Sequence, residues 1–160
     1  MIIGGNGIGR PSDIEAVSID EDDINCDPTD LPYKVSYHAS VYSSVLEGIV
    51  TCGGSTRWKI LSKCILQTKR NESNQFPSLI SKRAGLSLTA ISNKIFAIGG
   101  VPNENTMETI NLNTDKQWKQ EELPFSVKYH CSVRLGNKII VTGGWDCKFG
   151  NVSKIILKFT

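Results

Sequence analysis

Two tyrosine–histidine pairs are the residues of this chain whose types and spacing could support metal chemistry. Tyr37-His38 and Tyr129-His130 lie 92 residues apart, and the chain contains no other histidine. Imidazole is a common metal ligand, but two histidines without a neighbouring cluster of carboxylates make a poor transition-metal site. The five cysteines lack the CxxC spacing that is typical of zinc sites. We therefore expect no metal and no cofactor.

The sequence contains no other recognisable catalytic arrangement. A catalytic nucleophile needs a general base to activate it, and the sequence pattern shows no such pair. Segment 4–9 imitates a glycine-rich phosphate-binding loop, but the helix that must follow such a loop is missing from the sequence pattern. We therefore predict that the chain is not an enzyme.

Charge and hydropathy narrow the classes of partner. The formal net charge of +2 is too small for the basic surface of a nucleic-acid-binding protein. No apolar run approaches the roughly 18 residues that a membrane-spanning helix needs. A protein or a peptide is therefore the partner that we expect, with no nucleic acid and no membrane span.

Any binding residues must be positioned by a repeated set of strands, which four double glycines reveal. Each double glycine ends a short apolar run, and their first glycines are separated by 49, 46 and 44 residues: Gly4-Gly5, Gly53-Gly54, Gly99-Gly100 and Gly143-Gly144. A repeat of this length built from short strands predicts a β-propeller with one blade per repeat. Glycine is expected there because the backbone leaves the strand with a positive φ, or packs where a side chain would clash.

A second repeated segment gives the strand order within each blade. Segment 31–41 returns as segment 123–133, with a degenerate copy at 76–88. Alternating and β-branched residues predict first strands at 38–45, 86–91 and 130–135, and third strands at 14–19, 59–66, 106–112 and 152–159. Two-residue turns are expected at 47–48, 92–93 and 136–137, before second strands that run into the double glycines. A weaker fourth strand contains Trp118, with counterparts near 25–26 and 74–76.

The predicted fold is all-β, with stacked four-stranded antiparallel blades in a single region, 1–160. It comprises a partial blade 1–30, full blades 31–79 and 80–123, and a partial blade 124–160. A closed propeller has roughly four to eight blades, so this chain predicts a propeller fragment. Open ends expose apolar sheet faces, and we therefore expect self-association through the open edges.

These repeats resemble the kelch repeat family. The resemblance is carried by the apolar strands that end in double glycines, by Trp118 and by the Leu123-Pro124 step before the next first strand. It covers essentially the whole chain, and segment 84–124 matches best. It implies a kelch-type β-propeller whose first strands line the central axis, and a binding or scaffolding role rather than catalysis. It also implies ligand faces built from the loops after the double glycines and the loops into the first strands.

The candidate binding residues come from these two sets of loops, and they are Arg83, Tyr37, His38, Tyr129, His130, Arg57, Trp58 and Trp145. Arg83 matches the position where kelch domains often place a ligand-contacting arginine, which can hold a carboxylate through two parallel hydrogen bonds. Tryptophan and arginine often anchor interfaces, which favours Trp58 and Trp145. The alternative for the tyrosines and histidines is packing between blades, with their polar ends bonded to neighbouring backbone.

Three functions follow from these observations. The first is a non-catalytic protein–protein interaction module, which could be the substrate-recognition part of a larger protein. The second is a truncated or secreted kelch paralogue with a purely structural role. The third is a kelch-like metal enzyme that uses tyrosine and histidine near the axis, and the two isolated histidines make it the weakest of the three.

The cysteines allow two interpretations. They are either buried free thiols or members of one or two disulfides, such as Cys52–Cys64 and Cys131–Cys147. Antiparallel neighbours approach to about 4.5 Å between α-carbons, which is within disulfide range. The location stays open between cytoplasmic and, if disulfides form, secreted, because disulfides persist in oxidising compartments.

Overall fold

The computed structural model describes residues 2–3, 13–20, 23–30, 34–68, 73–146, 150–151 and 154–158, with side chains described within 34–68 and 73–146. All regular secondary structure in these residues is β-strand, and every strand pairing is antiparallel. The prediction of an all-β fold is therefore confirmed.

The strands form four main sheets in chain order, and two sheets have the predicted four strands. The first sheet contains β1 (Ile2–Ile3), β2 (Asp13–Asp20) and β3 (Asp23–Asp30). The second contains β4 (Ala39–Ser43), β5 (Gly48–Cys52), β6 (Cys64–Thr68) and β7 (Ser73–Phe76). The third contains β8 (Ser87–Ile91), β9 (Lys94–Ile98), β10 (Thr106–Asn111) and β11 (Lys119–Glu122). The fourth contains β12 (Cys131–Leu135), β13 (Lys138–Thr142) and β16 (Lys154–Lys158), and the hairpin β14 (Trp145–Asp146) and β15 (Gly150–Asn151) precedes β16.

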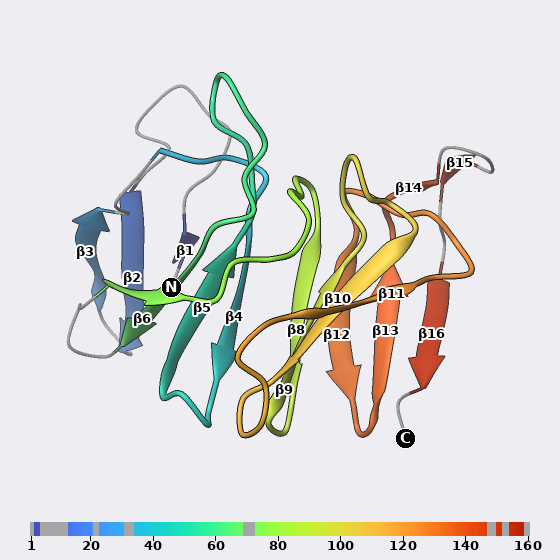
Figure 1. Ribbon diagram of the computed structural model, residues 1–160. Helices are drawn as coiled ribbons and strands as arrows, with labels where there is room; N and C mark the ends of the chain where they lie inside the picture. The colour runs from blue at the N-terminus through green and yellow to red at the C-terminus, as the bar shows by residue number, and fades with distance from the viewer. Residues whose placement is uncertain are drawn as a thin grey trace.

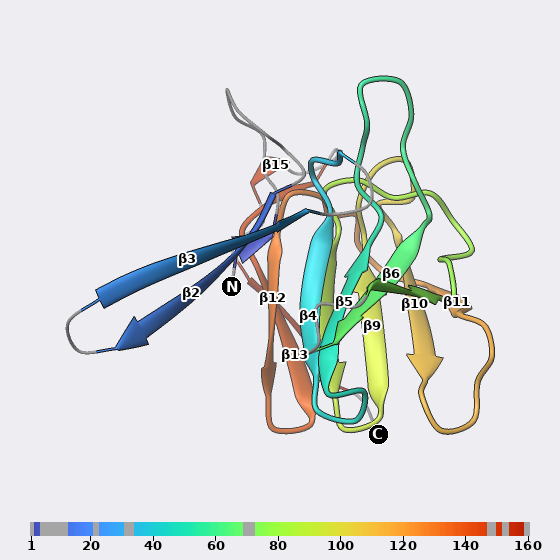
Figure 2. The ribbon, with the colours of Figure 1, turned by 90° about the vertical axis from the view of Figure 1, so that its left-hand side faces the viewer.

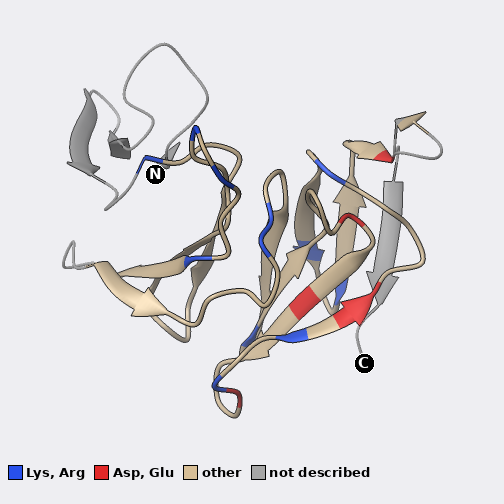
Figure 3. Cartoon of the chain, turned by 45° about the horizontal axis from the view of Figure 1, so that its top comes forward, with Lys and Arg blue, Asp and Glu red and all other residues tan. Residues whose placement is uncertain are grey.

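The sheets follow one another in a row, and those described do not close into a ring (Figure 1). The first strands of the second, third and fourth sheets are neighbours, because β8 contacts both β4 and β12. The turns between first and second strands lie together at the lower end, and the loops after the double glycines lie at the upper end (Figures 1 and 2). Figure 3, which is tilted toward the upper loops, shows the same order.

Several strand boundaries differ from the sequence prediction for local reasons. β6 begins at Cys64 rather than at 59, because Thr56 closes a turn in which Lys59 N donates to Thr56 Oγ1 at 3.2 Å. A four-residue loop, 44–47, joins β4 to β5, and Gly48 pairs with Ser43 instead of standing in the turn. Trp118 lies just before β11 rather than within the fourth strand. β9 and β13 are flanked by strands on both sides, as their apolar runs predict.

The double glycines of the second and third sheets have both properties that the sequence predicted for them. Gly53 and Gly99 have φ of 70° and 57°, in the left-handed region that favours glycine. A Cβ atom on Gly53 would lie 2.5 Å from the carbonyl oxygen of Arg83, which belongs to the entry of the third sheet. The glycines therefore allow one sheet to approach the backbone of the next.

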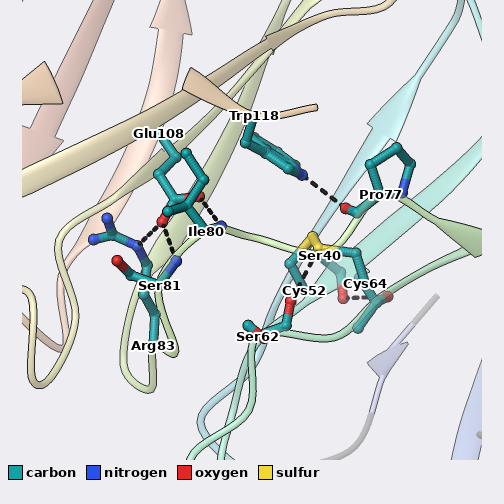
Figure 4. Close-up of a disulfide and its surroundings, with 11 residues drawn as sticks. Ser40, Cys52, Ser62, Cys64, Pro77, Ile80, Ser81, Arg83, Glu108 and Trp118 are labelled. Atoms are coloured by element: carbon teal, nitrogen blue, oxygen red, sulfur yellow. Dashed lines mark hydrogen bonds and ion pairs between the residues drawn. A yellow bond between two sulfur atoms is a disulfide. The ribbon is translucent and has the colours of Figure 1, made fainter. Parts of the chain in front are cut away.

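The apolar core lies between successive sheets. One cluster fills the junction of the second and third sheets, and a second cluster fills the junction of the third and fourth. Trp118 belongs to the first cluster, where its Nε1 donates to the carbonyl of Pro77 at 2.7 Å (Figure 4). Its ring also meets the ring of Phe76 edge-on. The second, third and fourth sheets thus bury apolar faces by stacking on one another.

A disulfide joins β5 to β6 within the second sheet. Cys52 and Cys64 are directly opposite in the register, and their sulfurs are 2.02 Å apart (Figure 4). This is one of the two pairs that the sequence analysis named. The other pair, Cys131–Cys147, is not formed, since Cys131 is a free, exposed thiol, and Cys147 lies outside the described residues.

Removal of this disulfide should lower the stability of the fold. The sequence separation of 12 residues corresponds to a loop-closure contribution of about 3 kcal/mol. The double variant Cys52→Ala/Cys64→Ala should lose about that amount of unfolding free energy in urea titrations. Reductant should destabilise the parent protein similarly and leave the variant unchanged. Equal stability of parent and variant under oxidising conditions would contradict the assignment.

Candidate functional site

The two sets of predicted loops meet at the upper end of the sheets. The residue after each double glycine pairs with the segment that leads into the first strand of the same sheet: Ser36 with Ser55, Ala84 with Val101, and Lys128 with Trp145. We call the segment before each first strand the entry segment. These bridges repeat in three successive sheets, so the loop end is built by the fold and not by one irregular loop.

An aromatic patch lies where the entry segments meet. Tyr37, Gly85 and Tyr129 occupy equivalent positions, and all three have left-handed φ values of 57°, 66° and 55°. The N–H of Gly85 donates to the carbonyl of Tyr37, and the N–H of Tyr129 donates to the carbonyl of Gly85, both at 2.8 Å. A Cβ atom on Gly85 would lie 2.6 Å from the ring of Tyr129. Glycine therefore lets the two half-exposed tyrosine rings approach to 5.7 Å across the intervening sheet.

The two tryptophans among the candidate residues lie in the loops after the double glycines. Trp145 is half-exposed, and its backbone pairs with Lys128, which precedes Tyr129. Trp58 is 83% exposed in the loop after Gly53-Gly54, and the Arg57 guanidinium lies 5.0 Å from the centre of its ring. Such a cation–π contact presents a flat, positively charged surface to the solvent.

A hollow of about 470 Å³ is lined by three lysines, one of which, Lys59, follows Trp58 in the chain. Lys59 and Lys63 come from the loop before β6, and Lys82 comes from the entry segment of the third sheet. Apolar side chains, including those of Leu61 and Phe76, also line the hollow. This lysine-lined hollow is not among the binding sites predicted from the sequence. A signal existed, because segment 34–82 contains seven lysines and arginines against two acidic residues. Figure 3 shows basic residues on these loops and acidic residues on β10 and β11.

Arg83 does not contact the solvent, and the expectation that it binds a ligand is wrong. Its exposure is 0%, and its Nε lies 3.0 Å from Glu108 Oε1 (Figure 4). Nη1 donates to the carbonyls of Gly99, Asn103 and Thr106, and Nη2 donates to Thr106 Oγ1 at 2.7 Å. The guanidinium therefore holds a carboxylate as expected of arginine, but that carboxylate is internal.

Glu108 connects this ion pair to the entry segment of the third sheet. Its carboxylate accepts hydrogen bonds from the backbone N–H groups of Ile80 at 2.6 Å and Ser81 at 3.0 Å. Burial lowers the pKa of Arg83 below its ordinary value, and the neighbouring Glu108 carboxylate opposes this shift. The Arg83–Glu108 ion pair stabilises the fold. The positive charge of the upper loops comes instead from Arg57 and from the three lysines that line the hollow.

Neither histidine is exposed on the surface of the loops. His130 is buried between the third and fourth sheets, with Nε2 2.7 Å from Ser87 Oγ. It therefore packs between sheets, as the alternative interpretation of the sequence expected, but its ring bonds to a side chain and not to the backbone. Burial lowers its pKa from 6.5 to about 4. His38 is partly buried. Within 34–68 and 73–146 no three His, Cys, Asp or Glu residues are grouped as metal ligands. The glycine-rich segment 4–9 lies outside the described residues.

Comparison of the chain with protein-family models and with curated proteins found no match. The resemblance to kelch repeats therefore remains an interpretation of the sequence. None of the described residues belongs to a helix with the length and apolar character needed to cross a membrane.

Substitution of Arg83 should destabilise the fold. Arg83→Ala leaves Glu108 buried without its counter-ion, which costs about 3–5 kcal/mol in comparable buried pairs. The exposed neighbour gives a matched control, because Lys82→Ala should change the unfolding free energy by no more than about 0.5 kcal/mol. Urea titrations of the two variants measure the difference. An Arg83→Ala variant as stable as its parent would contradict the stabilising role of the ion pair.

His130 should make stability depend on pH. Between its ordinary pKa of 6.5 and its folded-state pKa of about 4, the unfolded chain binds a proton that the folded chain does not. The stability contribution is complete above pH 6.5 and declines as pH falls toward 4, by on the order of 3 kcal/mol. His130→Gln should flatten this part of the profile in urea titrations from pH 7.5 to 4.5. If the unfolding free energies of parent and variant changed with pH in the same way, His130 would not be the source of the pH dependence.

Proposed function

We propose that this chain is a non-catalytic binding module of the kelch type, and that its loop end binds an acidic segment of a partner protein. One observation carries the proposal: the exposed Arg57–Trp58 pair directly precedes Lys59 in the chain, and Lys59 is one of the lysines that line the hollow. Loops mounted on a rigid scaffold are where binding residues usually lie.

The exposure of Trp58 supports an interface at this place. A tryptophan ring carries a large apolar area and has only two rotatable side-chain bonds, so a partner that covers it gains burial at little entropic cost. Because Arg57 lies over the ring, the same surface can offer both apolar contact and hydrogen-bond donors.

The charges of the hollow support an acidic partner. Among the described residues, no carboxylate forms an ion pair with Lys59 or Lys82. The volume of about 470 Å³ falls in the range of ligand pockets and would accommodate a few side chains. The apolar lining next to the ammonium groups favours a segment that mixes aspartate or glutamate with apolar residues.

The repeated architecture supports the kelch-type propeller as the scaffold. The second, third and fourth sheets stack with their first strands adjacent, and a double glycine stands at each of the two junctions between them. A purely structural role in a secreted paralogue is the second candidate. The Cys52–Cys64 bond favours an oxidising compartment for it, and does not conflict with binding.

Selection of random 12-residue peptides on the immobilised chain should test the proposed binding. Enriched peptides should contain aspartate or glutamate next to apolar residues. Trp58→Ala, and separately Lys59→Glu/Lys82→Glu, should weaken the best peptide about 5- to 150-fold, the range of 1–3 kcal/mol that interface anchors contribute.

The matched control is Lys116→Glu, which reverses an exposed lysine in the loop between β10 and β11. It should leave the affinity unchanged. Peptides without acidic enrichment, or affinities that ignore both variants at the loop end, would refute the proposal.

A further inference from the structure

The fourth sheet has an exposed face whose equivalent on the third sheet is covered by the fourth sheet. In the third sheet, Thr89 Oγ1 lies 2.6 Å from Ser132 Oγ of the fourth sheet, and Ile91 packs in the core between them. Val133 and Leu135 follow 44 residues later at the same places in the repeat, and they are 56% and 60% exposed. We call this surface the open face, and it comprises Cys131, Val133, Leu135, Ile140 and Thr142.

The double glycines show how closely this face could be approached. A Cβ atom on Gly53 would meet the carbonyl of Arg83, and one on Gly99 would meet the carbonyl of Val127, each in the entry segment of the next sheet. A Cβ atom on Gly143 would meet nothing within 4 Å in the described part of the chain. In the described part of the chain, no backbone stands at Gly143 in the place that Arg83 and Val127 take at Gly53 and Gly99.

The backbone hydrogen bonds indicate what chemistry fits that place. The N–H of Gly54 donates to the carbonyl of Arg83 at 2.7 Å, and the N–H of Gly100 donates to the carbonyl of Val127 at 2.9 Å. Gly144 has no such acceptor within the residues that the structure describes. The matching surface is therefore a sheet of the same repeat, headed by an entry segment that supplies this carbonyl.

The same chain carries a matching surface at its other end. Leu88 and Ala90 of β8 pack against the second sheet, but their equivalents in β4, Ser40 and Tyr42, are exposed, Tyr42 by 54%. β8 contacts β4 and β12, whereas no described strand of the first sheet is in comparable contact with β4.

The charges of the two ends are also complementary. β2 and β3 together contain six aspartates and glutamates and no lysine or arginine. β12, β13 and β16 together contain four lysines and arginines and no acidic residue. Head-to-tail order brings the acidic end of one molecule beside the basic end of another.

We propose that the open face docks the N-terminal end of a second copy of this chain in a head-to-tail assembly. Such an interface is heterologous, so it closes into a ring or continues as a filament. Its charged component should weaken at high salt. This assembly does not depend on the proposed peptide binding.

Light scattering and sedimentation over a range of concentrations test the assembly. The parent chain should associate, and more weakly in 500 mM than in 50 mM salt. Val133→Lys/Leu135→Lys, which blocks the open face, and Tyr42→Lys, which blocks the opposite face, should each weaken self-association at least tenfold. An equimolar mixture of the two variants should form heterodimers, because each retains one intact face.

Val45→Lys is the matched control, since Val45 is an exposed valine in the loop between β4 and β5, and it should associate like the parent. Circular dichroism checks that each variant stays folded. A parent chain that is monomeric at every concentration would overturn the proposal. Association that survives both blocking variants, or variants that fail to combine with each other, would overturn it as well.

Discussion

The buried ion pair between Arg83 and Glu108 is the interaction on which the junction of the second and third sheets depends. Desolvation of two charges is costly, and only complete hydrogen bonding offsets it. Arg83 makes five side-chain hydrogen bonds, and Glu108 accepts two backbone N–H groups in addition. The backbone of Arg83 also bonds to Gly54 and Leu61 of the second sheet. One residue thus anchors its own sheet and the preceding one.

The position of the candidate site follows from this anchoring. Once Arg83 holds the entry segment, Gly85 lies between the equivalent tyrosines and accepts the left-handed backbone that links them. Lys82 belongs to the same segment, and it lines the hollow together with Lys59 and Lys63 of the loop that carries Trp58. The proposed binding surface is therefore a consequence of sheet stacking, and its residues reach it from separate repeats.

In the described part of the chain, the stacked sheets also have two exposed faces, one on the second sheet and one on the fourth. A sheet of this repeat buries apolar area on both sides, so the last one in any open row keeps an exposed face. Val133 and Leu135 mark that face in the fourth sheet, and Tyr42 marks the opposite one. Binding at the loops and association at the ends use different surfaces, and both can operate in one molecule.

The sequence by itself determined the features that depend on local geometry and on repetition. The spacing of the double glycines predicted one sheet per repeat, and the positive φ of Gly53 and Gly99 follows from their residue type. The opposition of Cys52 and Cys64 followed from strand pairing. Only the tertiary structure decided the direction of Arg83, because its partner Glu108 lies 25 residues away on another strand. The lysine-lined hollow was likewise decided by folding, since its walls come from separate loops whose approach no local pattern records.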